Sequence, residues 1–275
     1  MDFSPRTAPY ILWSMTGLAF GPAQLMNRFS AYLMMALAIL LGGGSLVLLG
    51  FFLLVGPVNQ IRFRASEARM LWWDGSLCLL FFIQHSGMIR RSFHTWLDQL
   101  LSRDLHPALY AIVSGVALAA VVLLWQPSST IVWEIHGWFR LLPRLIAVLA
   151  IAGFIWGIRS LRTFDTFGLA PIKARLRGRP LPASRFMLRG PYLWVRHPLY
   201  LFMILLFWSG PEATADRLLF NLLWTAWVVL GSRLEERDLV SVFGGRYRRY
   251  QETVPMLVPW RGPAGRRLPT TDPGE

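Results

Sequence analysis

Two clusters of polar residues, about forty positions apart, hold the groups best suited to bind a charged ligand. The first is the run RGPYLWVRHPLY at 189–200. Pro198 suits the first turn of a helix, where no backbone N–H donor is needed. Arg196 and His197 would then lie at a helix start, whose free N–H groups and dipole favour an anion, with Tyr200 one turn later. Taken alone, the run fits a lipid headgroup as well as the carboxylate of a soluble ligand.

The second cluster is EERDLVSVFGGRYRRY at 235–250, directly after an apolar stretch. Glu235 and Glu236 begin it, and Tyr247 and Tyr250 share one face of a short amphipathic helix at its end. Taken alone, this pattern also fits an interfacial helix with arginines on lipid phosphates and tyrosines at the membrane surface. Together, the clusters offer basic groups for a carboxylate, acidic groups for an ammonium or ribose hydroxyls, and aromatic faces for a cation. S-adenosylmethionine (SAM) carries all of these groups.

Six apolar stretches could hold these clusters at a membrane surface. About 20 apolar residues cross a bilayer core, and the stretches are 31–56, 71–89, 108–125, 141–158, 198–210 and 217–232. Hydrophobic residues make up 54% of the chain, whereas charged residues make up 16%, against about 25% in soluble domains. We therefore expect an all-α, polytopic membrane helix bundle of about six spans, followed by a C-terminal cytoplasmic segment that binds the cofactor.

The basic residues predict the orientation of this bundle. The chain has 28 Lys and Arg against 15 Asp and Glu. With both termini in the cytoplasm, most basic residues fall in cytoplasmic segments, as the positive-inside rule requires. Three arginines in 57–70 are the exception, and a re-entrant segment 31–56 or insertion of residues 11–26 would change the side of that loop. The net charge of +13 therefore indicates anionic lipid rather than nucleic acid as the partner.

Several other features narrow the class of protein. Cys78 is the only cysteine, which excludes an internal disulfide and a thiolate metal cluster. Five histidines without close spacing predict no metal site. Residues 1–30 lack the pattern of a signal peptide and are expected to be interfacial or disordered. The Pro- and Gly-rich residues 261–275 are expected to form a disordered tail.

Beyond these features, the two clusters resemble the motifs of the integral-membrane methyltransferases, a superfamily that includes isoprenylcysteine carboxyl methyltransferase and phospholipid N-methyltransferases. The resemblance covers about 186–260. It implies a SAM site that the two clusters and the last two membrane helices form. Carried over by position, the residues that bind the cofactor would be Tyr192, Arg196, His197, Tyr200, Glu235, Glu236, Arg246, Tyr247 and Tyr250.

A third run brings the resemblance closer to the bacterial methanethiol S-methyltransferases. It is FIQHSGM at 82–88, with Arg91, Phe93 and Trp96 after it. The runs DTFGL at 165–169 and RGRP at 177–180 are similar to loops of the same family. This resemblance extends over about 70–260. One departure is HPALYAI at 106–112, where the family usually has ERSTYVL, and the acceptor could differ accordingly.

The combined prediction is methyl transfer from SAM to a small or lipophilic thiol, with 31–158 on the acceptor side and 159–260 as the methyltransferase core. Gln84, His85 and Met88 would bind the acceptor, and His85, Arg196 and Glu236 would be catalytic. An ionisable residue inside a span suggests function, although His85 also fits a structural histidine that bonds a neighbouring helix. The alternatives are carboxyl O- or phospholipid N-methylation on the same fold, and a non-catalytic accessory membrane protein of nitrogen-oxide metabolism. The expected location is the bacterial inner membrane.

Overall fold

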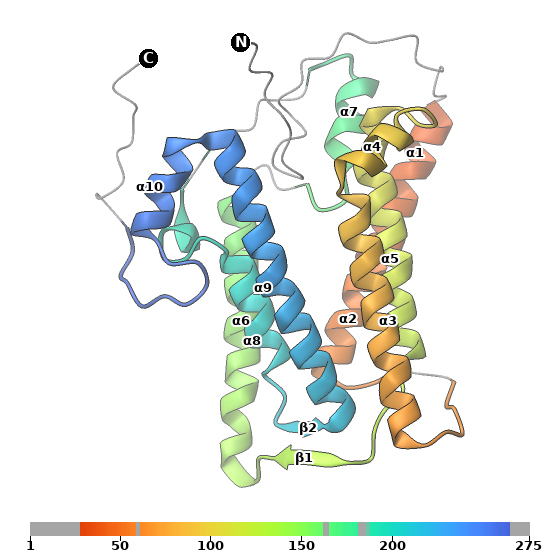
Figure 1. Cartoon of the computed structure of the whole chain (residues 1–275), viewed down its shortest axis with the longest axis vertical. Coiled ribbons are helices and arrows are strands. Elements are labelled where there is room, and N and C mark those ends of the chain that lie inside the picture. The colour runs from red at the N-terminus through yellow and green to blue at the C-terminus, as the bar shows by residue number, and fades with distance from the viewer. Residues whose placement is uncertain (1–27, 59–60, 162–164, 181–185, 187, 265–275) are drawn as a thin grey trace.

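The computed structural model describes residues 28–264, except 59–60, 162–164, 181–185 and 187. The predictions for residues 1–27 and 265–275 lie outside this described part. Helices dominate the described residues and run roughly along the long axis of the molecule (Figure 1). A helical bundle is confirmed, whereas the number of membrane spans stays a prediction.

The N-terminal half contributes three long helical segments. The first is nearly continuous and passes through a π-helical turn, η1; its parts are α1 (Arg28–Leu37), η1 (Ala38–Gly43) and α2 (Gly44–Leu54). The others are α3 (Glu67–Met88) and α5 (His106–Leu124). A side chain at Gly115 of α5 would place its Cβ 2.6 Å from the Leu41 carbonyl oxygen, so glycine lets these two backbones touch.

The C-terminal half contributes α6 (Leu141–Ser160), α8 (Pro198–Phe207), α9 (Ala215–Phe243) and α10 (Gly245–Thr253). Gly153 and Gly157 of α6 leave room for the side chains of Phe202 and Leu199 on α8. The predicted last span is only part of α9, which continues beyond it as one helix of 29 residues. Its final turns carry Glu235 and Glu236 out to the end of the bundle where α10 lies (Figure 1).

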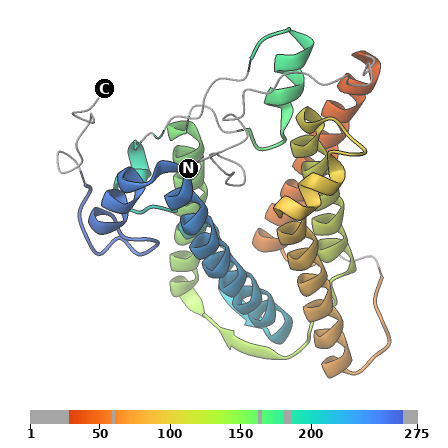
Figure 2. The same cartoon turned by 45° about the horizontal axis from the view of Figure 1, so that its top comes forward.

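Shorter elements gather at that same end of the bundle, as Figure 2 shows for α7 and α10. They are α4 (Arg91–Leu97), α7 (Leu169–Leu176) and the 3₁₀ turns η2 (Arg103–Leu105) and η4 (Gly190–Leu193). The Asp165 carboxylate accepts hydrogen bonds from the first backbone N–H groups of α7 at 2.9 and 2.6 Å. Phe167 packs on Gly42, and Gly168, with φ +66°, packs on Pro107. Residues 165–169 thus pack the start of α7 against the N-terminal helices.

The opposite end holds a small sheet that the all-α prediction did not include. Strand β1 (Ile131–Glu134) pairs antiparallel with β2 (Glu212–Thr214), near the 3₁₀ turn η3 (Gly137–Arg140). Both connections leave the bundle at this end, and pairing satisfies backbone groups that would otherwise lack partners. The all-α prediction is wrong in this detail.

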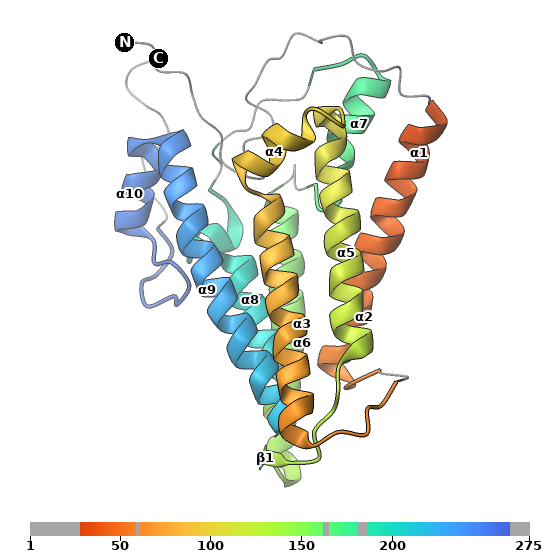
Figure 3. The ribbon, with the colours of Figure 1, turned by 45° about the vertical axis from the view of Figure 1, so that its right-hand side comes forward.

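Among the described residues, three helices are long and apolar enough to cross a membrane, namely Arg28–Leu54, Arg103–Leu124 and Gly137–Ser160. Many large apolar side chains on their outer faces are exposed, such as Leu40, Val47 and Val148. In a bilayer these faces would contact lipid. Inside the bundle, α3 and α9 lie against each other (Figure 3). Aromatic rings form a cluster in this interior. The apolar exterior agrees with an integral membrane protein.

Candidate functional site

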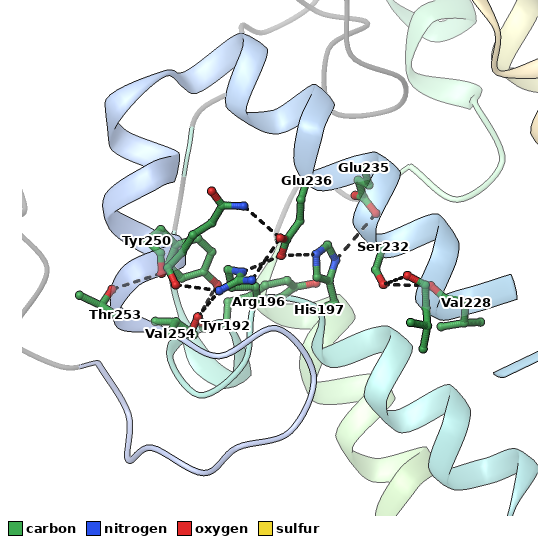
Figure 4. Close-up of polar contacts among 12 residues, drawn as sticks. Tyr192, Arg196, His197, Val228, Ser232, Glu235, Glu236, Tyr250, Thr253 and Val254 are labelled. Carbon is green, nitrogen blue, oxygen red and sulfur yellow. Dashed lines mark hydrogen bonds and ion pairs between the residues drawn. The ribbon is translucent and has the colours of Figure 1, made fainter. Parts of the chain in front are cut away.

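The two predicted clusters meet through an ion pair between Arg196 and Glu236 (Figure 4). Arg196 precedes α8, and Glu236 lies near the end of α9. The guanidinium Nε donates to Glu236 Oε1 at 2.6 Å, and Nη2 donates to Oε2 at 3.1 Å. Both side chains are only about a tenth exposed (10% and 11%). This two-point geometry fixes both groups more firmly than a single contact would.

The remaining guanidinium nitrogen of Arg196 binds the backbone at the end of α10. Its Nη1 donates to the backbone carbonyl oxygens of Gln251, at 2.9 Å, and of Val254. The backbone N–H groups of Arg196 and His197 donate to the carbonyls of Pro255 and Met256 at 2.9 and 3.1 Å. Arg196 therefore joins α8, α9 and α10, and its donors are engaged within the protein.

His197, Tyr200 and Glu235 form the more open side of the cluster. His197 Nε2 lies 3.1 Å from Glu236 Oε1, and its Nδ1 lies 3.8 Å from Glu235 Oε2. Tyr200 donates to Glu235 Oε2 at 2.9 Å, and its ring stacks on His197 with centroids 5.4 Å apart. The Glu235 side chain is 29% exposed, against 11% for Glu236. Glu235 is therefore the carboxylate that a ligand can reach.

The other tyrosines of the cluster are buried rather than presented to solvent. Tyr247 and Tyr250 are 2% exposed and pack with Phe186 beneath α10. The Tyr250 hydroxyl donates to the Tyr192 carbonyl at 2.6 Å. Burial raises the pKa of the Tyr192, Tyr247 and Tyr250 hydroxyls, which therefore stay neutral. Arg246, in contrast, is exposed on α10.

Glu236 is ionised in this environment. Burial would raise the pKa of its carboxyl, but hydrogen bonds from His197 and Arg196, the Arg196 charge and a bond from Gln251 outweigh burial and lower the pKa to about 2. Gln251 Nε2 donates to Glu236 Oε2 at 3.0 Å. The carboxylate thus accepts hydrogen bonds from three side chains.

This lowered pKa predicts a loss of stability in acid. A carboxyl with a lowered folded-state pKa stabilises the fold above its unfolded value, near 4.5, and this contribution disappears as the pH falls toward 2. Between pH 4.5 and pH 2 we expect the free energy of unfolding to fall by about 3 kcal/mol more in the wild type than in Glu236→Gln, since one pKa unit corresponds to about 1.4 kcal/mol. Unfolding midpoints of both proteins in detergent, measured between pH 5 and pH 2, test this. Parallel pH profiles for the two proteins would contradict it.

His85 lies deeper in the bundle, on α3. Its Nε2 shares a hydrogen bond of 2.5 Å with the Tyr110 hydroxyl of α5. The rings of Phe81, Tyr110 and Trp227 lie around the imidazole at centroid distances of 5.2, 4.9 and 5.1 Å. Its Nδ1 is buried and has no hydrogen-bond partner among the described residues. A buried polar atom without a partner is uncommon and requires an explanation.

The other two predicted acceptor residues lie beside His85 but face α5. Gln84 Nε2 is 3.0 Å from Met88 Sδ and 3.3 Å from Ser114 Oγ. Gln84 Oε1 is buried and also has no partner among the described residues. Gln84, His85 and Met88 therefore gather around the contact between α3 and α5.

Aromatic rings from α3 and α9 form one wall beside His85. Phe82 stacks on Trp227 at 4.8 Å, and Phe81 stacks on Trp224 at 5.1 Å. The Trp227 indole donates to Ser86 Oγ at 3.3 Å. Tyr200 packs against the same aromatic cluster. Tyr200 therefore contacts both Glu235 of the polar cluster and the aromatic interior that contains His85.

Three residues of this arrangement were not predicted from the sequence. Tyr110 stands inside the run 106–112, which drew notice only as a departure from a family pattern. Trp227 is one of 13 tryptophans and looked like a packing residue, and Gln251 follows directly after the predicted motif. The absence of a metal site remains a prediction: the described residues contain no group of three or more His, Cys, Asp or Glu side chains placed to hold a metal ion.

Comparisons with known proteins identify relatives over most of the chain. It is 36% identical over 191 residues to methanethiol S-methyltransferase 1 of Bradyrhizobium diazoefficiens, covering 67% of this chain and 65% of the relative. It is also 36% identical over 228 residues to methanethiol S-methyltransferase of a Pseudomonas strain, covering 79% of this chain and 85% of the relative. Rat Nurim is 30% identical over 190 residues, covering 66% and 70%. No family model and no solved structure matches.

Proposed function

Because the chain belongs to the methanethiol S-methyltransferase family, we propose that it transfers a methyl group from SAM to a small or lipophilic thiol and yields a methyl sulfide. The observation that carries this proposal is the position of His85. Its unpartnered Nδ1 lies among aromatic rings of the interior, against which Tyr200 of the Arg196–Glu236 cluster also packs. Largely aromatic surroundings with an unpaired ring nitrogen suit a small thiol.

The donor set of the cluster fits SAM. Glu235 can accept hydrogen bonds from an ammonium group or ribose hydroxyls because its carboxylate is partly exposed. The rings of Tyr192 and Tyr200 can face a sulfonium, which aromatic faces attract. When bound, SAM would supply a methyl group carried on a positively charged sulfur. We assign Glu235, Tyr192, Tyr200 and His197 to direct contact with it.

The remaining residues of the cluster hold this contact surface in place. Arg196 and Glu236 bind each other at two points and fasten α10. Tyr247 and Tyr250 pack α10 against the end of α9, and Arg246 lies exposed at the edge where it can close over a ligand. In this proposal Arg196 and Glu236 are essential to the reaction through the shape of the site.

On the acceptor side, His85 receives the hydrogen of the thiol, and the aromatic wall excludes water. A thiol attacks more readily as thiolate, so a base at His85 increases its reactivity. Removal of water also favours a step in which opposite charges neutralise each other. Holding the two reactants in line supplies much of the remaining acceleration.

The same proposal extends to domains and location. Residues 31–158 form the acceptor side, 159–260 form the methyltransferase core, and 1–30 and 261–275 flank them. The bundle would lie in the bacterial inner membrane with both termini in the cytoplasm, so that α10 and the ends of α8 and α9 meet cytoplasmic SAM. The apolar helices and the distribution of basic residues support this orientation.

Two measurements on the detergent-purified full chain test the function. Isothermal titration should show SAM binding, and headspace chromatography should show dimethyl sulfide when methanethiol is added. A wild type that binds no SAM would contradict the proposal. If methanethiol is unchanged while a prenylcysteine or phosphatidylethanolamine is methylated, the acceptor assignment is wrong and the alternative activity is correct.

A further inference from the structure

The two ring nitrogens of His85 have different surroundings. Nε2 shares a short hydrogen bond with the Tyr110 hydroxyl, whereas Nδ1 is buried without a partner among the described residues. Leaving a buried polar atom unpaired is unfavourable. Phe81 and Trp227 flank the ring and limit its rotation. The imbalance is explained if a ligand atom completes the bonding at Nδ1.

We propose that Tyr110 is a positioning residue for His85. Its hydroxyl oxygen accepts a hydrogen bond from Nε2–H, and this fixes the tautomer in which Nδ1 carries the lone pair. The hydrogen bond at one imidazole nitrogen sets the protonation of the other. The lone pair at Nδ1 then faces the acceptor thiol. This inference rests on the proposed thiol methylation.

In this tautomer, Nδ1 can accept the proton of the thiol. The S–H bond breaks and its proton goes to Nδ1, while the thiol electron pair forms the new C–S bond of the sulfide. The electron pair of the broken donor C–S bond stays on the donor sulfur. The imidazole gains one positive charge as the sulfonium charge is lost, so the net charge within the site does not change. The Tyr110 oxygen stabilises the N–H group on the other side of the charged ring.

The test compares two thiols of similar size and different acidity. Ethanethiol must lose its proton in the site, whereas 2,2,2-trifluoroethanethiol is largely thiolate at mildly alkaline pH. With saturating SAM we expect Tyr110→Phe to lower kcat about 100-fold for ethanethiol and only about threefold for the fluorinated thiol, because general-base assistance contributes 10²–10⁴-fold. The SAM dissociation constant should stay at the wild-type value.

A spectroscopic measurement without SAM tests the tautomer directly. In ¹⁵N-histidine-labelled protein, the His85 signal is identified by its loss in His85→Gln. It should show Nε2–H in the wild type and a mixture of tautomers in Tyr110→Phe. A wild-type signal with hydrogen on Nδ1 would overturn the proposal.

Tyr32→Phe is the matched control, because Tyr32 lies on another helix, α1, and is 60% exposed. Equal losses for both thiols in Tyr110→Phe would mean a structural role and overturn the inference, as would no loss with either. If Tyr110→Phe does not fold, fluorotyrosine at position 110 keeps the ring shape and weakens the acceptor. The same selective loss is then expected, and an unchanged rate ratio overturns the inference. A wild type that methylates neither thiol would instead refute the proposed function.

Discussion

Glu236→Ala is expected to abolish SAM binding and to destabilise the C-terminal half of the protein. The change removes both acceptors of the Arg196 guanidinium, whose side chain is 10% exposed. Removing one partner of a buried ion pair costs about 3–5 kcal/mol because the other charge stays buried. Arg196 also binds the carbonyls of Gln251 and Val254, so its displacement releases the end of α10. Titration calorimetry with SAM and thermal unfolding in detergent measure the two effects.

Glu252→Ala is the matched control for this variant. Glu252 is an exposed acid on α10, and its side chain makes no ion pair among the described residues. The Glu252→Ala protein should bind SAM as the wild type does. Its free energy of unfolding should lie within about 0.5 kcal/mol of the wild-type value, the usual range for surface changes. Normal SAM binding by Glu236→Ala would show that the cofactor site lies elsewhere.

The Arg196–Glu236 pair shows how far the sequence leads. Residue types and spacing identified both residues and suggested that they serve one site. The sequence suggested a ligand carboxylate as the partner of Arg196, whereas the folded chain supplies Glu236 and two backbone carbonyls. These partners are 40 to 58 positions away along the chain. Periodicity within one helix does not predict contacts of this range.

The helices and the small sheet make a similar contrast. The apolar stretches predict α5 and α6 closely because length and composition decide whether a helix forms there. The pairing of β1 with β2 joins segments about eighty residues apart, and neither is long enough to be recognised alone. Helix α9 continues past its apolar stretch to Phe243, as good helix formers such as Glu235 and Glu236 favour.

The comparisons confirm the resemblance to methanethiol S-methyltransferases that the motifs indicated. The departure at 106–112 has a structural meaning. It places His106 and Pro107 at the start of α5, whereas Tyr110, whose hydroxyl meets His85 one turn later, matches the tyrosine of ERSTYVL. Pro107 also packs against Gly168. Residues 106–112 thus contribute both to helix packing and to a contact with the proposed base His85. Changes in this run are therefore expected to affect which acceptor binds.

His85→Gln is expected to remove thiol methylation while SAM binding stays intact. Glutamine keeps a polar side chain of similar length beside Tyr110 but offers no basic nitrogen. A general base contributes about 10²–10⁴-fold, so kcat for methanethiol should fall by that factor at saturating SAM. Headspace chromatography measures the product, and titration calorimetry measures SAM binding in the same preparation.

His136→Gln provides the matched control, because His136 is 77% exposed at the opposite end of the bundle, near the small sheet. Its activity should equal that of the wild type. Loss of SAM binding in His85→Gln would place the imidazole on the cofactor side instead, and unchanged activity would exclude it as the base. Because Glu236→Ala acts through binding and His85→Gln acts through the reaction, the two variants together separate the cofactor half of the site from its acceptor half.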